Sequence, residues 1–155
     1  MFGFDGINYS IDTSLQHLWE RRATVRSRPQ RQLSENEGHF YPISRQPLCS
    51  HPLVKNMGED AIQFILIQSA YKFMWDIAQI ETRLVNNVAE KIANDRFTVK
   101  FPEGMKFNGL TVLVDESYHA YVARDFMHQL YGATKVSPIA EVVSRNFDLR
   151  HYKYQ

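Results

Sequence analysis

The sequence predicts an all-α protein, and three observations lead to this prediction. Apolar residues recur at the period of an amphipathic helix over 58–94 and again over 110–131. Prolines and glycines, which interrupt helices, gather before and between these two stretches. The chain has 155 residues, of which 44% are hydrophobic, so it can bury the core of one domain. We therefore expect a helical bundle dominated by two long helices.

Residues 1–57 are expected to form an N-terminal helix followed by an extended covering segment. The helix begins at one of the capping residues 12–14 and ends before Pro29. The segment 30–58 contains three prolines, which argues against a long regular element there. Residues 58–155 are expected to form a half-length helical bundle, and both parts belong to a single domain.

Residues 58–94 are expected to be helical throughout. One straight rod of this length would exceed about 50 Å, so we expect a break or kink near 73–76. Asn108 can cap a second long helix, which runs over about 110–131 and stops at Gly132. A short last helix is expected over 139–147.

Three ionisable residues occupy positions of these helices where apolar residues are expected. Glu81 lies in the apolar stripe of the first long helix, and Glu116 and His119 share one face of the second. A carboxylate in such a place costs several kcal/mol unless it is neutralised, and one metal ion neutralises several groups together. The stripes consist of Met74, Ile77, Ala78, Glu81, Leu84, Val85, Val88 and Ile92, and of Val112, Glu116, His119, Ala123, Phe126 and Leu130.

The donor types indicate which metal is expected. Carboxylates with one imidazole per metal suit iron or manganese, whereas structural zinc prefers thiolates. Four-helix carboxylate proteins hold two metals with one Glu on each of two helices and Glu-x-x-His on each of the other two. This chain carries one of each element, in Glu81 and in Glu116 with His119, which is half the set. Asp115 is placed to accept the proton of the metal-bound imidazole.

Other interpretations of the same residues remain open. A single Glu-x-x-His pattern often belongs to a solvated helix face, and Glu81 can instead pair with Arg83 or Arg124. Asp115 can equally be a plain exposed acid. Asn86 and Asn87 are candidates for hydrogen bonds across the bundle.

Composition argues against several kinds of partner, location and metal site. The formal charge of +1 argues against nucleic acid or an anionic membrane as the main partner. No apolar run is long enough to cross a bilayer and the first residues lack a secretory signal, so a cytoplasmic location is expected. The single cysteine, Cys49, rules out an intramolecular disulfide and a cysteine-cluster metal site.

Two segments resemble the N-terminal half of the p-aminobenzoate N-oxygenase family. They are Gln-Ile-Glu-Thr-Arg-Leu-Val-Asn at 79–86 and Val-Asp-Glu-Ser-Tyr-His-Ala at 114–120, and Ser-His-Pro-Leu at 50–53 is also similar. The resemblance covers about residues 35–131. It implies a ferritin-like bundle with two iron ions, in an enzyme that uses dioxygen and an external electron donor to oxidise arylamines toward hydroxylamines and nitro products.

Carried across by motif, the resemblance implies that Glu81, Glu116 and His119 are ligands of iron, while the donor types alone leave manganese as the alternative. The family's other ligands come from a later Glu and a His- and Glu-rich helix, and this chain departs from that pattern. Glu141 and His151 are the sole candidates after His119, at a separation that does not match.

Three interpretations follow from this departure. The chain is a half-length enzyme that needs a complementary half, or two copies pair so that each supplies half of the ligands, or it is a metal-free ferritin-like remnant that serves as a helical interaction module. Two amphipathic helices bury only part of their stripes against each other, so we expect at least a homodimer.

Overall fold

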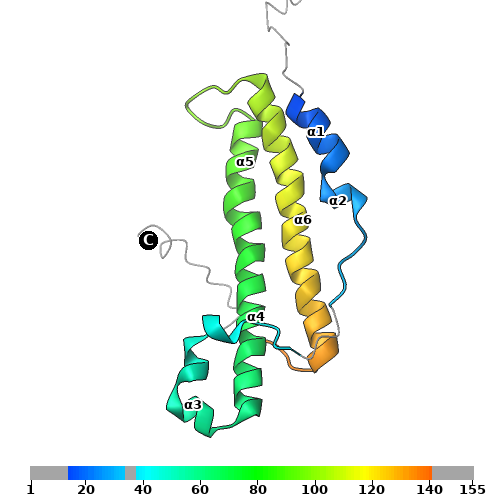
Figure 1. The fold of residues 1–155 in the computed structure, drawn as a ribbon. Helices are drawn as coiled ribbons and strands as arrows, with labels where there is room; N and C mark the ends of the chain where they lie inside the picture. The colour runs from blue at the N-terminus through cyan, green and yellow to red at the C-terminus, as the bar shows by residue number, and fades with distance from the viewer. Residues whose placement is uncertain (1–13, 34–37, 141–155) are drawn as a thin grey trace, which may run out of the picture. The chain divides into compact units, whose positions relative to one another are not determined.

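The computed structural model describes residues 14–33 and 38–140, which are mostly helical and contain no strand (Figure 1). The all-α prediction is therefore confirmed over the described chain. The elements are α1 (Ser14–Arg22), α2 (Thr24–Ser27), the 3-10 helices η1 (Ile43–Arg45) and η2 (Pro47–Ser50), α3 (Pro52–Asn56), α4 (Glu59–Ile80), the π-helical turn η3 (Glu81–Val85), α5 (Asn86–Ala93) and α6 (Glu103–Thr134).

The chain divides into two compact units. Unit 1 consists of Met1–Pro29 with Glu81–Tyr118, and unit 2 consists of Gln30–Ile80 with His119–Gln155. One boundary lies at the junction of α4 with η3, and the other lies inside α6.

Unit 2 contains the largest fully buried side chains, Leu66, Tyr71 and Leu130. Leu130 of α6 packs in one cluster with Ile67, Ala70 and Tyr71 of α4. A second cluster joins the alanines Ala78, Ala120 and Ala123, which are small enough to let two helices approach closely. Hydrophobic burial between α4 and the second half of α6 therefore holds this unit together.

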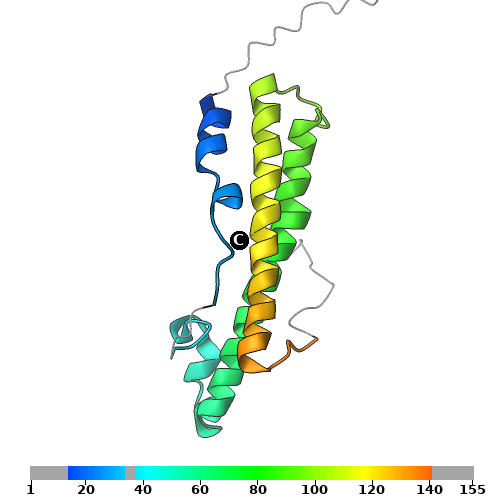
Figure 2. The ribbon, with the colours of Figure 1, turned by 90° about the vertical axis from the view of Figure 1, so that its right-hand side faces the viewer.

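In unit 1 the first half of α6 lies between α1 and α5, as the two views agree (Figures 1 and 2). On one side Gln16 Nε2 of α1 donates to Asn108 Oδ1 at 2.7 Å. On the other side Gly109 of α6 lies against Ala89 and Ala93 of α5. The helices are thus joined by polar contacts at α1 and by close backbone packing at α5.

An ion pair closes the connection between α5 and α6. Lys106 Nζ lies 2.5 Å from Asp95 Oδ2 and 2.7 Å from Glu103 Oε1. The hydrogen bond from Lys106 lowers the pKa of the Asp95 carboxyl, and the same two acids raise the pKa of Lys106. Asp95 has a φ of 52°, a left-handed conformation that lets the chain leave α5.

The break predicted near 73–76 is wrong, because α4 continues without interruption to Ile80. The irregularity comes one turn later, at η3, where hydrogen bonds of a π-turn join residues five apart instead of four. The span 58–94 is otherwise helical as predicted.

The π-turn explains why part of the predicted apolar stripe is exposed. A wider turn moves every later residue around the helix by about one position. The face expected at Val88 accordingly passes to Ala89: Val88 is 41% exposed and Ala89 only 4%. Leu84, inside the turn, is 42% exposed. Asn86 is partly buried, and its Nδ2 donates to Ser117 Oγ of α6.

The second long helix is longer than predicted at both ends. It begins at Glu103 rather than near 110, because the Pro102 carbonyl accepts from the backbone N–H groups of Met105 and Lys106. Asn108 is therefore inside the helix and not its cap. Gly132 does not end it either; the helix stops at Thr134, and Lys135 follows with a left-handed φ of 58°.

The remaining sequence predictions concern the covering segment, the membrane and the C-terminal residues. Segment 38–58, which was expected to be an extended covering segment without a long regular element, holds the short helices η1, η2 and α3. None of the helices in the described ranges is both long and apolar enough to span a membrane. The helix predicted over 139–147 is absent at Ile139 and Ala140, while its other residues, together with Glu141 and His151, lie outside the described chain.

We predict that Gly109→Ala lowers the free energy of unfolding by about 1–3 kcal/mol. A Cβ at Gly109 would lie 3.0 Å from Ala89 O and 3.2 Å from Ala93 N, and these backbone atoms move only if α5 moves. The matched control is Gly132→Ala in the same helix, where a Cβ would meet nothing within 4 Å. The control should gain up to about 1 kcal/mol from helix propensity. Urea denaturation measures both, and an equal gain in the two variants would contradict the packing.

Candidate metal centre

The structure brings Glu81 and Glu116 together inside unit 1. Glu81 is the first residue of η3 and Glu116 lies in α6, and their carboxylate oxygens come within 4.8 Å of one another. Both side chains are partly buried. Two carboxylates at this distance repel each other when ionised, and a cation between them removes that repulsion.

His119 follows Glu116 by three residues in α6, so the helix itself sets the two side chains one turn apart. His119 is exposed rather than at the core position that its stripe predicts. The buried side of α6 at this level is formed by Ala120 and Ala123, which puts the imidazole at its border. An imidazole at such a border can still ligate a metal through one nitrogen while the other meets solvent or a hydrogen-bond acceptor.

Asp115 has a partner that the sequence did not indicate. Trp19 Nε1 of α1 donates to Asp115 Oδ2 at 2.9 Å. The carboxylate therefore ties α1 to α6 beside the candidate ligands. Its predicted interaction with the imidazole stays a prediction.

Asn86 and Ser117 lie close in sequence to Glu81 and Glu116, respectively. Asn86 follows Glu81 by one π-turn, and its Nδ2 donates to Ser117 Oγ at 3.1 Å, so one of the two asparagines predicted to bond across the helices does so. Ser117 Oγ in turn donates to the Leu113 carbonyl at 2.6 Å. Asn86 Oδ1 is buried and accepts no hydrogen bond among the described residues. A buried acceptor left without a donor is costly, so this atom suits a bound water.

An ion pair of Glu81 with Arg124 was one alternative to metal binding, so the position of the Arg124 guanidinium matters. Arg124 Cζ stands 4.0 Å from the centre of the Trp75 ring. This is the geometry of a cation–π contact within unit 2. Arg83 is exposed in η3.

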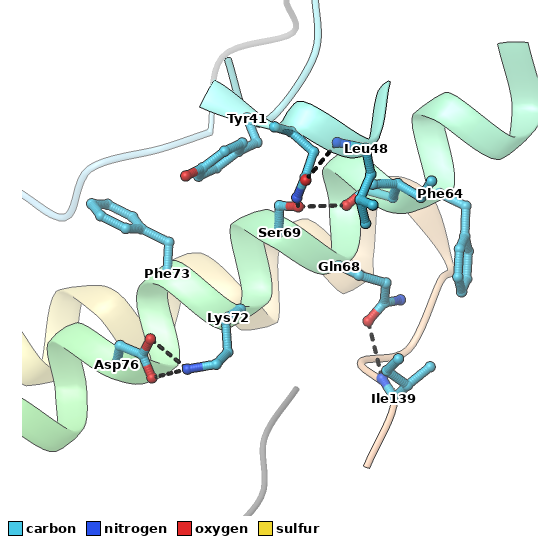
Figure 3. A pocket seen from close by; sticks show the side chains of 11 residues that line it. Tyr41, Leu48, Phe64, Gln68, Ser69, Lys72, Phe73, Asp76 and Ile139 are labelled. Carbon is cyan, nitrogen blue, oxygen red and sulfur yellow. Dashed lines mark hydrogen bonds and ion pairs between the residues drawn. The ribbon is translucent and has the colours of Figure 1, made fainter. Parts of the chain in front are cut away.

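Unit 2 also contains an open groove of about 510 Å³ (Figure 3). Aromatic and aliphatic side chains, among them Tyr41, Phe64 and Phe73, form most of its wall. Lys72 and Asp76 are its charged residues, and they pair with each other, so the groove offers little net charge to a ligand. The groove belongs to unit 2, whereas the carboxylate pair belongs to unit 1.

Fold and site together define a class, an all-α protein in which two carboxylates from separate helical segments meet. Beyond that class, no protein-family model, no curated protein and no solved structure matches the sequence. The resemblance to the N-oxygenase family therefore depends on the short segments at 79–86 and 114–120 and on the similar stretch at 50–53.

We predict that Asp115→Ala loosens the attachment of α1, because it removes the acceptor of the Trp19 N–H. The sequence has two tryptophans, so a Trp75→Phe background makes Trp19 the sole emitter. In that background Asp115→Ala should shift the fluorescence of Trp19 toward the longer wavelength of a solvated indole. Asp115→Asn keeps an acceptor oxygen and serves as the control. Identical spectra for the alanine variant and the parent would show that the hydrogen bond does not hold α1.

Proposed function

We propose that the chain supplies half of a dinuclear carboxylate metal centre and that the completed centre is a dioxygen-dependent oxygenase acting on an amine. The observation that carries the proposal is the meeting of Glu81 and Glu116 oxygens within 4.8 Å in unit 1. His119 joins them in the proposal as the imidazole ligand, since it lies one helical turn after Glu116.

The donor chemistry supports iron or manganese as the metal. Two carboxylates and one imidazole are ligands that suit these ions, and zinc in a structural site would favour thiolates. The sequence has one cysteine only, Cys49. Asn86, five residues after Glu81 in the sequence, has a buried Oδ1 that accepts no hydrogen bond within the part of the chain that the structure describes. A metal-bound water would be a donor for this atom.

A dinuclear centre of this type needs twice the ligands that the described chain offers, namely four carboxylates and two imidazoles. We propose that a second copy, related by a two-fold axis, supplies the other half. Exposed apolar residues beside the candidate ligands support pairing: Leu84 follows Glu81 in η3, and Val112 lies one turn before Glu116. A second pair of helices would cover both.

The roles of the residues follow from their positions. Glu81 and Glu116 would hold the metals, and His119 would complete the ligand set of one of them. Asp115, whose Oδ2 is held by Trp19, would accept the imidazole proton of His119 and so fix which nitrogen binds the metal. When bound and reduced by an external donor, the two metals supply the electrons that activate dioxygen toward an amine nitrogen. The ferritin-like architecture and the arylamine class of substrate come from the resemblance alone.

A metal-free interaction module is the second candidate function. The exposed apolar residues of unit 1, including Leu84, Val88 and Val112, favour it as much as they favour a dimeric enzyme. The two candidates differ in what they require of the carboxylates, because an interaction module has no need of Glu81 or His119. A complementary half-chain in place of a second copy is the third arrangement, and it predicts metal binding only in a mixture of the two polypeptides.

We predict that Glu81→Ala and His119→Ala each abolish binding of ferrous iron while helix content is retained. The physical reason is that each variant removes a ligand from a set that is already minimal. Iron content after anaerobic loading and gel filtration, with circular dichroism alongside, measures the outcome. Matched controls are Glu90→Ala, a helical Glu that pairs with Arg96, and His17→Ala, an exposed helical His of α1.

Each result separates the candidates. Iron near one ion per chain in the parent and controls, lost in both site variants, supports the shared centre. If the two site variants bind as much iron as the parent does, the ligand assignment is wrong. If the parent binds no iron, either by itself or mixed with a complementary half-chain, the metal-free interaction module is the candidate that remains.

We predict a mass of two chains in solution at micromolar concentration, because burial of the apolar residues around the carboxylates favours pairing. Val88→Glu should lower the mass to that of one chain by placing a charge on this surface. Val99→Glu is the control, since Val99 is an exposed valine of the connection between α5 and α6. Multi-angle light scattering measures all three proteins, and a folded parent with the mass of one chain would contradict the pairing.

A further inference from the structure

A second cavity, which belongs to unit 2, combines a cationic edge with apolar walls. It measures about 370 Å³. Met127, Pro138 and the ring of Tyr71 supply apolar surface, and Arg124 and His128 supply polar groups. Its size lies in the range of small-molecule sites, about 300–1,000 Å³.

The polar groups come from one face of α6. Arg124, His128 and Tyr131 are spaced by four and then three residues, which places them in a row along the helix. Each is exposed, so a ligand in solution can reach all three. The row lies beyond the motif around Glu116 and is not needed by the proposed metal centre.

Packing orients the Arg124 guanidinium. Its Cζ stands 4.0 Å above the Trp75 ring of α4. A stacked guanidinium keeps its N–H groups at its edge, where they can donate two parallel hydrogen bonds to an anion. The contact therefore restrains an otherwise flexible side chain before any ligand binds.

Two buried polar side chains hold the opposite wall. Gln68, only 6% exposed, donates to the Ser137 carbonyl at 3.0 Å and accepts from the Ile139 N–H at 3.0 Å. Tyr71 OH donates to the Val136 carbonyl at 2.9 Å. The left-handed Lys135 turns the chain back toward α4 so that these bonds form. The segment 136–139 is thus a fixed wall rather than a loose end.

The charged side chain that lines the cavity in the described part of the chain, Arg124, favours an anion. Among the residues that the structure describes, no carboxylate lines it. Burial, and after it the neighbouring Tyr131, raise the pKa of Tyr71 and so favour its neutral phenol further. The larger groove of the same unit differs in this respect, because its Lys72 is neutralised by Asp76. An anion at Arg124 would therefore meet hydrogen-bond donors and, among the described lining residues, no competing acid.

We propose that this cavity binds a small organic anion, with its carboxylate or phosphate group at Arg124 and His128 and its apolar part against Met127 and Pro138. Tyr131 and Ser137 offer hydroxyl donors at the rim. The site is independent of the proposed oxygenase activity, since it shares no residue with the metal ligands.

The test uses 3-phenylpropionate and phenyl phosphate as separate probes, measured by isothermal titration calorimetry on the full chain. We expect saturable binding of one molecule per chain, and the tighter probe identifies the head group. The neutral 3-phenylpropanamide should not compete. Arg124→Met should weaken binding at least about tenfold, as expected for loss of a charged hydrogen bond. Arg124→Lys should give an intermediate loss, because it keeps the charge without the planar fork.

Control variants keep the test decisive. Arg45→Met changes an arginine of unit 2 that does not line the cavity, and it should leave the affinity unchanged. His128→Gln leaves the Arg124–Trp75 contact in place and should still weaken binding several-fold, which covers the case in which Arg124→Met does not fold. The proposal is overturned if neither probe saturates by about 10 mM, if the amide competes equally, or if Arg124→Met and His128→Gln bind as the parent does.

Discussion

The close approach of α5 to the first half of α6 is the constraint on which unit 1 depends. Gly109 leaves no side chain between the helices, and Ala89 and Ala93 present only methyl groups, so backbones nearly touch. Helix spacing is set by the side chains at the contact, and small ones allow the shortest spacing. Because Glu81 and Glu116 project from segments continuous with this contact, their oxygens can come within 4.8 Å. Larger residues at the contact would separate the carboxylates and remove the geometry that suits a cation.

Much of the fold could be predicted from the sequence, because helical periodicity is a local property. The helical span 58–94 and the lack of a long regular element over the described residues 38–58 follow from apolar spacing and breakers. The face of α5 could not be predicted in the same way. At 3.6 residues per turn, the sequence pattern predicts Val88 on the buried face of α5. The extra residue in η3 places Ala89 on that face instead.

Within the candidate site, contacts between the two predicted helix stripes were predictable, whereas partners outside these stripes were not. The meeting of Glu81 with Glu116 follows from their places in the two stripes, but the exposure of His119 does not. The bond between Trp19 and Asp115 joins residues 96 apart in sequence, and no local pattern encodes such a pair. The row of Arg124, His128 and Tyr131 has helical spacing and could have been noticed, but its significance depends on a wall built by Gln68 and Tyr71.

The π-turn has a consequence for how distant relatives of this chain should be aligned. A helix that contains one extra residue differs from its ordinary counterpart by a single-codon insertion with no loop to absorb it. An alignment that forbids gaps inside helices would therefore pair Glu81 correctly and then mismatch every position of α5. Allowing a one-residue gap between Glu81 and Val85 would align Ala89 and Ala93 by their places in the contact with Gly109 of α6.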